Sequence, residues 1–246
     1  MIHIYAKGII GTTSSTATSN QEIELHENLS IILQILCNML SAEYEGLCPE
    51  DVELAMESDA VSVSVVFDGV NTILPLVTQP MLQYPTLLGD YMNLISQLFE
   101  FCPSRLKLLQ PTLLQSMMAS IMFGMDQSFE IAQSCLQSIK NLAIYSIRKP
   151  PALPILQSCS QALVRHIISR PFDSNLLSTA ATVIVVLWRL YPDDFENMLV
   201  HNNPHGQSLK ALAVNVSPIL MGPSLVQFQI AFVKFVAVSK ASTVLW

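Results

Sequence analysis

The chain has 246 residues, of which 51% are hydrophobic and only 13% are charged, and its formal net charge is −7. Soluble domains usually have about 25% charged residues, and intrinsic disorder requires few apolar residues and many charges. The composition therefore excludes disorder for most of the chain and predicts a large apolar core. An acidic chain lacks the basic surface that polyanions require, so we expect no nucleic acid among its partners.

Charge is distributed unevenly along the chain. Residues 1–104 contain 13 acids and one base, Lys7, whereas residues 105–246 contain 11 bases and 6 acids. We interpret the segment 42–59 as an acidic insertion, because it contains a run of seven acids. This run is either a solvated loop or a cargo-facing patch that attracts a basic partner. Its members are Glu43, Glu45, Glu50, Asp51, Glu53, Glu57 and Asp59.

The N-terminal elements follow from composition and periodicity. Residues 1–19 are mostly small and polar with no core pattern, which predicts a disordered lead-in. Helical spacing begins near Gln21 and continues to about Leu40, and Ser19 with Glu22 has the pattern of a capping box.

After the acidic segment, the sequence shows both a strand-like and a helical periodicity. Residues 61–65 alternate like a strand, but the longer apolar pattern has helical spacing. We therefore expect a helix over 60–78, kinked near its end by Pro75.

Prolines separate the remaining helical patterns. Capping-box patterns predict helix starts at Thr112 and Ser224, and Asp173 is a candidate cap. The first predicted helices lie between Pro85 and Pro103, from Thr112 to Met125, between Ser128 and Pro150, and between Pro150 and Pro171. The others cover 175–191, lie near 193–201 and 207–220, and continue from Ser224 onward.

Three comparable helical patterns begin near Pro85, Glu130 and Asn175, at intervals of about 45 residues. Arrays of the HEAT and armadillo type have a period of about 40–47 residues per helix pair. We therefore expect an all-α chain in which residues 20–246 form an α-α superhelix of about five helix pairs. A compact helical bundle is the alternative.

The sequence lacks the common motifs of nucleotide-binding, zinc-protease and serine-hydrolase sites. It contains no G-x-x-x-x-G-K-[ST], no H-E-x-x-H and no G-x-S-x-G, so we predict neither an enzyme nor a cofactor or metal site. No apolar stretch is long and unbroken enough for membrane insertion.

The cysteines are odd in number and lack C-x-x-C spacing, which favours free thiols in a reducing compartment. They are Cys37, Cys48, Cys102, Cys135 and Cys159.

Two further groups have both a structural and a functional interpretation. His166 could serve a site, but its helical surroundings favour a residue at the core boundary. A methionine stripe could form an adaptable binding groove, although helical spacing favours a core face. The stripe contains Met117, Met118, Met122 and Met125.

Four runs resemble the C-terminal region of the exportins, which belong to the importin-β (karyopherin) superfamily. They are VFDGVNTILPL (66–76), YPTLLGDYMNLISQLFEF (84–101), SMMASIMFGM (116–125) and EIAQSCLQSIKNLA (130–143). The similarity extends over roughly 60–240 and weakens toward the end.

The resemblance implies a HEAT solenoid that carries folded proteins through nuclear pores. Its partners would be cargo proteins, including basic ones, nuclear pore proteins and the GTP-bound GTPase Ran. The family's principal Ran-binding repeats lie near the N-terminus of a much longer chain. We therefore expect a C-terminal part of a receptor, shuttling between nucleus and cytoplasm, that does not bind Ran-GTP tightly by itself. The alternative is a helical-repeat scaffold without a Ran cycle.

Overall fold

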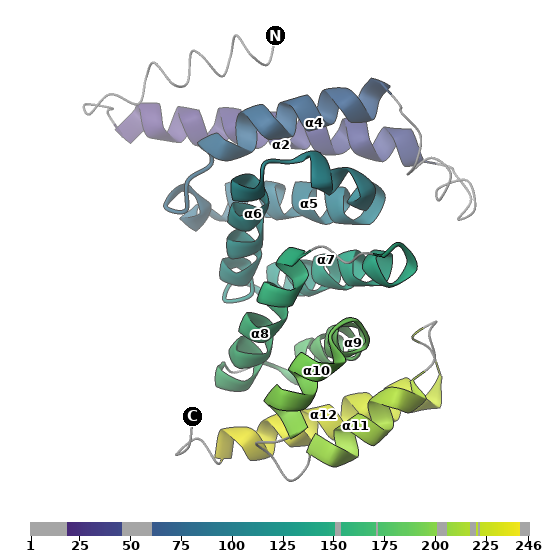
Figure 1. Ribbon diagram of the computed structural model, residues 1–246. Helices are drawn as coiled ribbons and strands as arrows, with labels where there is room; N and C mark the ends of the chain where they lie inside the picture. The colour runs from purple at the N-terminus through teal and green to yellow at the C-terminus, as the bar shows by residue number, and fades with distance from the viewer. Residues whose placement is uncertain are drawn as a thin grey trace. The chain divides into compact units, whose positions relative to one another are not determined.

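The computed structural model describes most of the chain, and all regular structure in the described part is helical (Figure 1). This confirms the all-α class for those residues. The predicted lead-in apart from Ser19, and residues 46–59 of the acidic segment, lie outside the described part. The described residues are 19–45, 61–150, 154–170, 172–200, 206–216, 220 and 222–241.

The chain divides into two compact units, Met1–Gly124 and Met125–Trp246. In its described part, the N-terminal unit has four α-helices and three short 3-10 helices. These are α2 (Ser19–Tyr44), α4 (Val61–Ile73), η1 (Leu74–Leu76), η2 (Met81–Gln83), α5 (Pro85–Phe101), η3 (Pro103–Leu108) and α6 (Pro111–Gly124).

The described part of the C-terminal unit has five longer α-helices, one single-turn α-helix and a π-helical segment. These are α7 (Phe129–Arg148), α8 (Pro154–Ser169), α9 (Ser174–Leu190), α10 (Pro192–Phe195), the π-helix η4 (Glu196–Val200), α11 (Gly206–Asn215) and α12 (Pro223–Ala241).

In the N-terminal unit, α2 packs against both α4 and α5. Its buried stripe is aliphatic and repeats at intervals of three or four residues, as the helical period requires. α4 approaches α2 closely at Gly69, where a Cβ atom would lie only 2.7 Å from Cδ2 of Leu36. The buried stripe of α2 consists of Leu29, Leu33, Leu36 and Leu40.

In the C-terminal unit, α9 packs against α7 on one side and α12 on another, and it also contacts α8. The run from Val183 to Trp188 is buried at every position. A helix that is apolar on all faces requires neighbours on several sides, and α7, α8 and α12 provide them.

Both units therefore pair helices that are not consecutive in the sequence. α5 packs on α2, and α9 packs on α7 and α12. The helices α5, α7 and α9 begin at residues 85, 129 and 174, which confirms the predicted interval of about 45 residues.

Two predicted helix starts are confirmed by side-chain caps. Oδ1 of Asp173 accepts hydrogen bonds from the backbone N–H groups of Asn175 (2.7 Å) and Leu176 (2.8 Å) at the start of α9. Ser128 caps α7 by accepting a hydrogen bond from the N–H of Ile131 at 3.4 Å. Each side chain satisfies an N–H group that has no partner inside its helix.

Two capping-box predictions were wrong. Thr112 and Ser224 are the second residues of α6 and α12, which begin at Pro111 and Pro223. Proline suits the first helical position, because its φ is already helical and the N–H that it lacks has no partner there. The proline therefore takes that position, and the hydroxyl residue that follows it lies inside the helix.

Other boundaries also moved. α2 begins at Ser19 and continues to Tyr44, so the helix starts at the predicted cap and extends beyond Leu40. Residues 61–65 are helical, as the longer pattern predicted, and Pro75 lies in the 3-10 turn that follows α4. α11 ends at Asn215, before the predicted boundary.

Gly69 in α4 and Gly89 in α5 form a matched pair for testing the packing of α2. We expect Gly69→Ala to lower the free energy of unfolding by about 1–2 kcal/mol, because the new methyl group overlaps buried Leu36. Gly89→Ala should raise it by about 0.5–1 kcal/mol, because nothing lies within 4 Å of the added Cβ and alanine favours the helix. Urea unfolding of both variants tests this, and equal effects would contradict the close approach.

Candidate functional site

The predicted acidic patch is only partly described, and its first member is engaged in helix packing. Oε2 of Glu43, near the end of α2, accepts a hydrogen bond from the hydroxyl of Ser62 in α4 at 2.5 Å. Glu45 follows α2 and is exposed. The other members lie outside the described residues: Glu50, Asp51, Glu53, Glu57 and Asp59.

The N-terminal unit contains a groove of about 460 Å³ between the first half of α2 and the chain leading into α5. Three large apolar side chains in its lining are unusually exposed: Ile23 (49%), Ile31 (53%) and Tyr84 (43%). We call this feature the α2 groove. Its full lining is Ile23, His26, Glu27, Ser30, Ile31, Gln34, Tyr84, Pro85, Thr86 and Leu87.

Hydrogen bonds to one carboxylate join the two helices beside the α2 groove. Oδ2 of Asp90 in α5 accepts hydrogen bonds from the hydroxyl of Ser30 and from Nε2 of Gln34, the latter at 3.0 Å. Both donors belong to α2 and line the groove. They hold α2 and α5 in one register, so the shape of the groove depends on the packing of this helix pair.

An aromatic contact forms another part of the groove lining. The rings of His26 and Tyr84 lie 3.9 Å apart, between their centroids. Burial lowers the pKa of His26, and the nearby carboxylate of Glu22 opposes that effect. Nδ1 of His26 is buried and has no hydrogen-bond partner among the described residues. Apart from Glu27, the lining is uncharged at neutral pH, and it combines aliphatic and aromatic side chains with the polar groups of Ser30, Gln34 and Thr86.

The sequence analysis did not identify this groove. The helical spacing from Gln21 to Leu40 predicts the helix, but it does not show which of the apolar residues in that helix lie outside the buried stripe. Ile31 and Ile35 do so, and both are about half exposed. They are four residues apart and therefore neighbours on the helix surface, and a contiguous exposed apolar patch can mark a further contact surface.

The C-terminal unit has a smaller groove of about 270 Å³, where α9, α10 and α11 meet. Trp188 lines it and stacks on Phe195 at a centroid distance of 5.9 Å. At the rim, Nζ of Lys210 lies 2.5 Å from Oε1 of Glu196. Glu196 begins the π-helix η4, and Lys210 belongs to α11, so this ion pair joins the two elements.

His166 lies at the boundary of the core, as predicted, and its side chain is 13% exposed. Its Nε2 atom lies 3.3 Å from Oδ1 of Asp126, without the geometry of a hydrogen bond. Nη2 of Arg170 lies 3.6 Å from the other oxygen of that carboxylate. Burial lowers the pKa of His166, Asp126 raises it and Arg170 lowers it.

The methionine stripe of α6 is mainly core, as predicted. Met117, Met118 and Met125 are buried, and Met122 is half-buried. Three of the four methionines are therefore core residues.

The four described cysteines are not joined in disulfide bonds, and all four are buried. Burial raises the pKa values of Cys37, Cys135 and Cys159 to about 12, and it also raises the pKa of Cys102. These groups are therefore protonated at neutral pH and are weak nucleophiles.

The described residues contain neither a candidate metal site nor a candidate membrane-spanning helix. No group of three or more His, Cys, Asp or Glu side chains lies close enough together there to hold a metal ion. None of the helices in that part of the chain combines the length and hydropathy needed to cross a membrane.

The chain matches no model of a known protein family. Its candidate sites are therefore defined by geometry alone. They are surface grooves between packed helices, and the α2 groove is larger and has more exposed apolar side chains.

The buried thiols predict slow chemical modification. In a Cys48→Ser variant, which leaves only the four described thiols, iodoacetamide at neutral pH should label the native chain at least about 100-fold more slowly than the chain in urea. Mass spectrometry of quenched samples measures the rates. A described thiol that is labelled equally fast in both states would contradict its burial.

The two described histidines predict lower stability in mild acid. Their native pKa values lie below the ordinary 6.5, so the unfolded chain binds more protons. Their stabilising effect is present above pH 6.5 and is lost as the pH falls toward the lowered native pKa values. Urea unfolding should show a smaller free energy of unfolding at pH 5.5 than at pH 7.

A His26→Gln/His166→Gln double variant should show a weaker dependence over the same interval, because both titrating groups are removed. The single variants separate the two contributions. A pH dependence that is unchanged in the double variant would show that other groups cause it.

Proposed function

We propose that the chain is a protein-binding segment of a HEAT- or armadillo-like helical-repeat array. The observation that supports this most directly is the packing of α9 on both α7 and α12, which are not its neighbours in sequence. In a solenoid, each repeat contacts only the repeats beside it, and equivalent helices stack. The regular interval between the starts of α5, α7 and α9 agrees with such an array.

Within this class, we propose a nuclear transport receptor of the exportin type, or its C-terminal part, acting in Ran-dependent export. The support is the resemblance of residues 66–76, 84–101, 116–125 and 130–143 to exportin-4. All four runs fall mainly on helices, in α4 with η1, α5, α6 and α7. On this proposal the chain binds cargo proteins and nuclear pore proteins, moves between nucleus and cytoplasm, and acts with Ran-GTP only together with further repeats.

A helical-repeat scaffold without a Ran cycle is the second candidate. The same helix packing suits it, because stacked helix pairs form extended binding surfaces in many unrelated proteins. The two candidates differ in one property. A transport receptor crosses the nuclear pore faster than an inert protein of the same size, and a scaffold does not.

Passage through the nuclear envelope tests this proposal. The chain of 27.2 kDa, fused to one fluorescent protein, should enter and leave nuclei faster than two fluorescent proteins in tandem, which have a similar total mass. Photobleaching of the nucleus measures both rates. Equal rates would contradict the receptor proposal and favour the scaffold, provided that circular dichroism shows the fusion to be helical.

A further inference from the structure

The α2 groove combines exposed apolar side chains with a defined shape. Ile23 and Ile31 lie eight residues apart, which is about 12 Å along a helix. Both line the groove together with Tyr84, and each of the three is more than 40% exposed. Burying one such isoleucine under a partner would be favourable, because its apolar surface would leave water.

The surface around this groove has one sign of charge. Every ionised side chain at neutral pH in the described parts of α2, α4 and α5 is acidic, because no Lys or Arg occurs between Lys7 and Arg105. Glu27 lines the groove itself, and Glu24 is exposed on the same helix. These carboxylates repel one another without compensation from nearby bases on the same helices.

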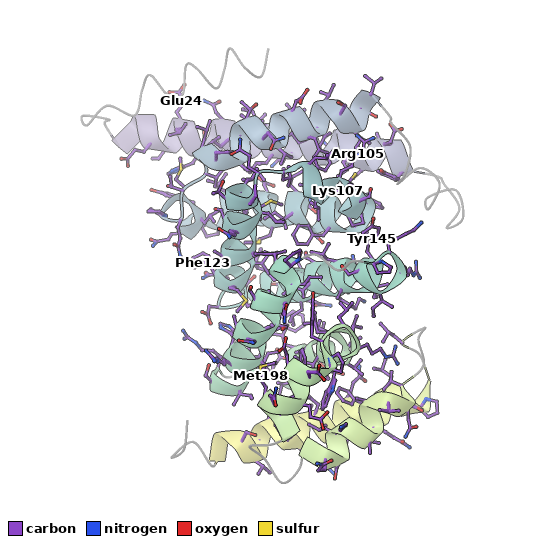
Figure 2. All side chains as sticks on the ribbon, in the orientation of Figure 1. Glu24, Arg105, Lys107, Phe123, Tyr145 and Met198 are labelled. Carbon is purple, nitrogen blue, oxygen red and sulfur yellow. The ribbon has the colours of Figure 1, made fainter. Side chains whose placement is uncertain are left out.

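The first bases after Lys7 lie toward the other end of the helix. Figure 2 shows Glu24 near the N-terminal end of α2, with Arg105 and Lys107 toward its C-terminal end. Arg105 lies close enough to Tyr44, at that end, to influence its pKa. The acidic field at the groove is therefore not neutralised by these two side chains.

A partner for this surface must satisfy two requirements. It must offer apolar side chains at intervals of one or two helical turns, to cover the exposed isoleucines and Tyr84. It must also carry positive charge beside those side chains, to offset the carboxylates around the groove. An amphipathic helix with Lys or Arg flanking its apolar face meets both requirements, in the helix-in-groove mode of recognition.

We propose that the α2 groove is a docking site for a basic amphipathic helix of a partner protein. Apolar contacts with Ile23, Ile31 and Tyr84 supply most of the affinity, and the surrounding carboxylates increase the association rate. This inference deepens the protein-binding role proposed above, on which it rests, and it names the chemistry of the partner. It makes no use of Ran or of nuclear passage.

The test uses a fluorescein-labelled synthetic peptide of about 18 residues, five helical turns, with leucines on one face and lysines on the other. A second peptide keeps the leucines and replaces every lysine with glutamate. Fluorescence anisotropy with the full chain should show saturable binding of the basic peptide and at least about tenfold weaker binding of the acidic one. Raising the salt from about 50 to about 300 mM should weaken binding of the basic peptide, because salt screens the exposed carboxylates.

Two variants in the α2 groove have matched controls on α4. Ile31→Asp should weaken peptide binding about tenfold or more, whereas Val65→Asp, which changes another exposed apolar residue, should not. Glu27→Lys should weaken it about two- to fivefold and reduce its salt dependence, whereas Asp68→Lys should have a smaller effect. Circular dichroism and urea unfolding check that all four variants fold.

Three results would overturn the proposal. They are absence of saturable binding of the basic peptide, equal binding of both peptides, and equal effects of each groove variant and its control. Sedimentation addresses another occupant. Self-association that Ile31→Asp abolishes, in a chain that binds no peptide, would assign the groove to a second copy of the chain. Because nuclear passage is measured separately, failure of this site leaves the passage result to decide the receptor proposal.

Discussion

The packing of α9 is the interaction on which the described part of the C-terminal unit depends. Its apolar side chains face in every direction, so no single partner helix can cover them. α7 and α12 both pack on α9, although they lie far from each other in sequence. α2 has a similar role in the N-terminal unit, where it holds α4 and α5. The low charge content of the chain follows from this arrangement, because central helices have little surface left for charged side chains.

The all-α class and most helix positions could be predicted from the sequence, because long amphipathic patterns outweigh short local signals. The strand-like alternation at 61–65 is an example, since the apolar spacing of the longer segment determined the outcome. Helix starts were less predictable where a proline, which favours the first helical position, directly precedes a hydroxyl residue that could cap the helix. Pro111 and Pro223 occupy first helical positions and displace the expected caps, whereas Asp173 and Ser128 have no such competitor and cap their helices.

The candidate site was much less predictable than the fold. The acidic run is visible in the sequence, and Glu43 shows that such a residue can instead serve the contact between two helices. The α2 groove depends on Tyr84, which precedes α5 and meets α2 more than fifty positions away in sequence. The periodicity of a single helix cannot predict this contact between Tyr84 and α2. The exposed isoleucines of α2 gain a functional interpretation only once the chain leading into α5 lies beside them.

The π-helical segment η4 makes the chain that follows it sensitive to the loss of a single residue. A π turn holds about one residue more than an α turn, so removing one residue from 196–200 would allow ordinary α geometry. The residues after the deletion would then rotate by about 100° around the helix axis. Glu196 would no longer be held in its present register with Lys210. A one-residue deletion here would therefore change the direction in which the chain continues toward α11.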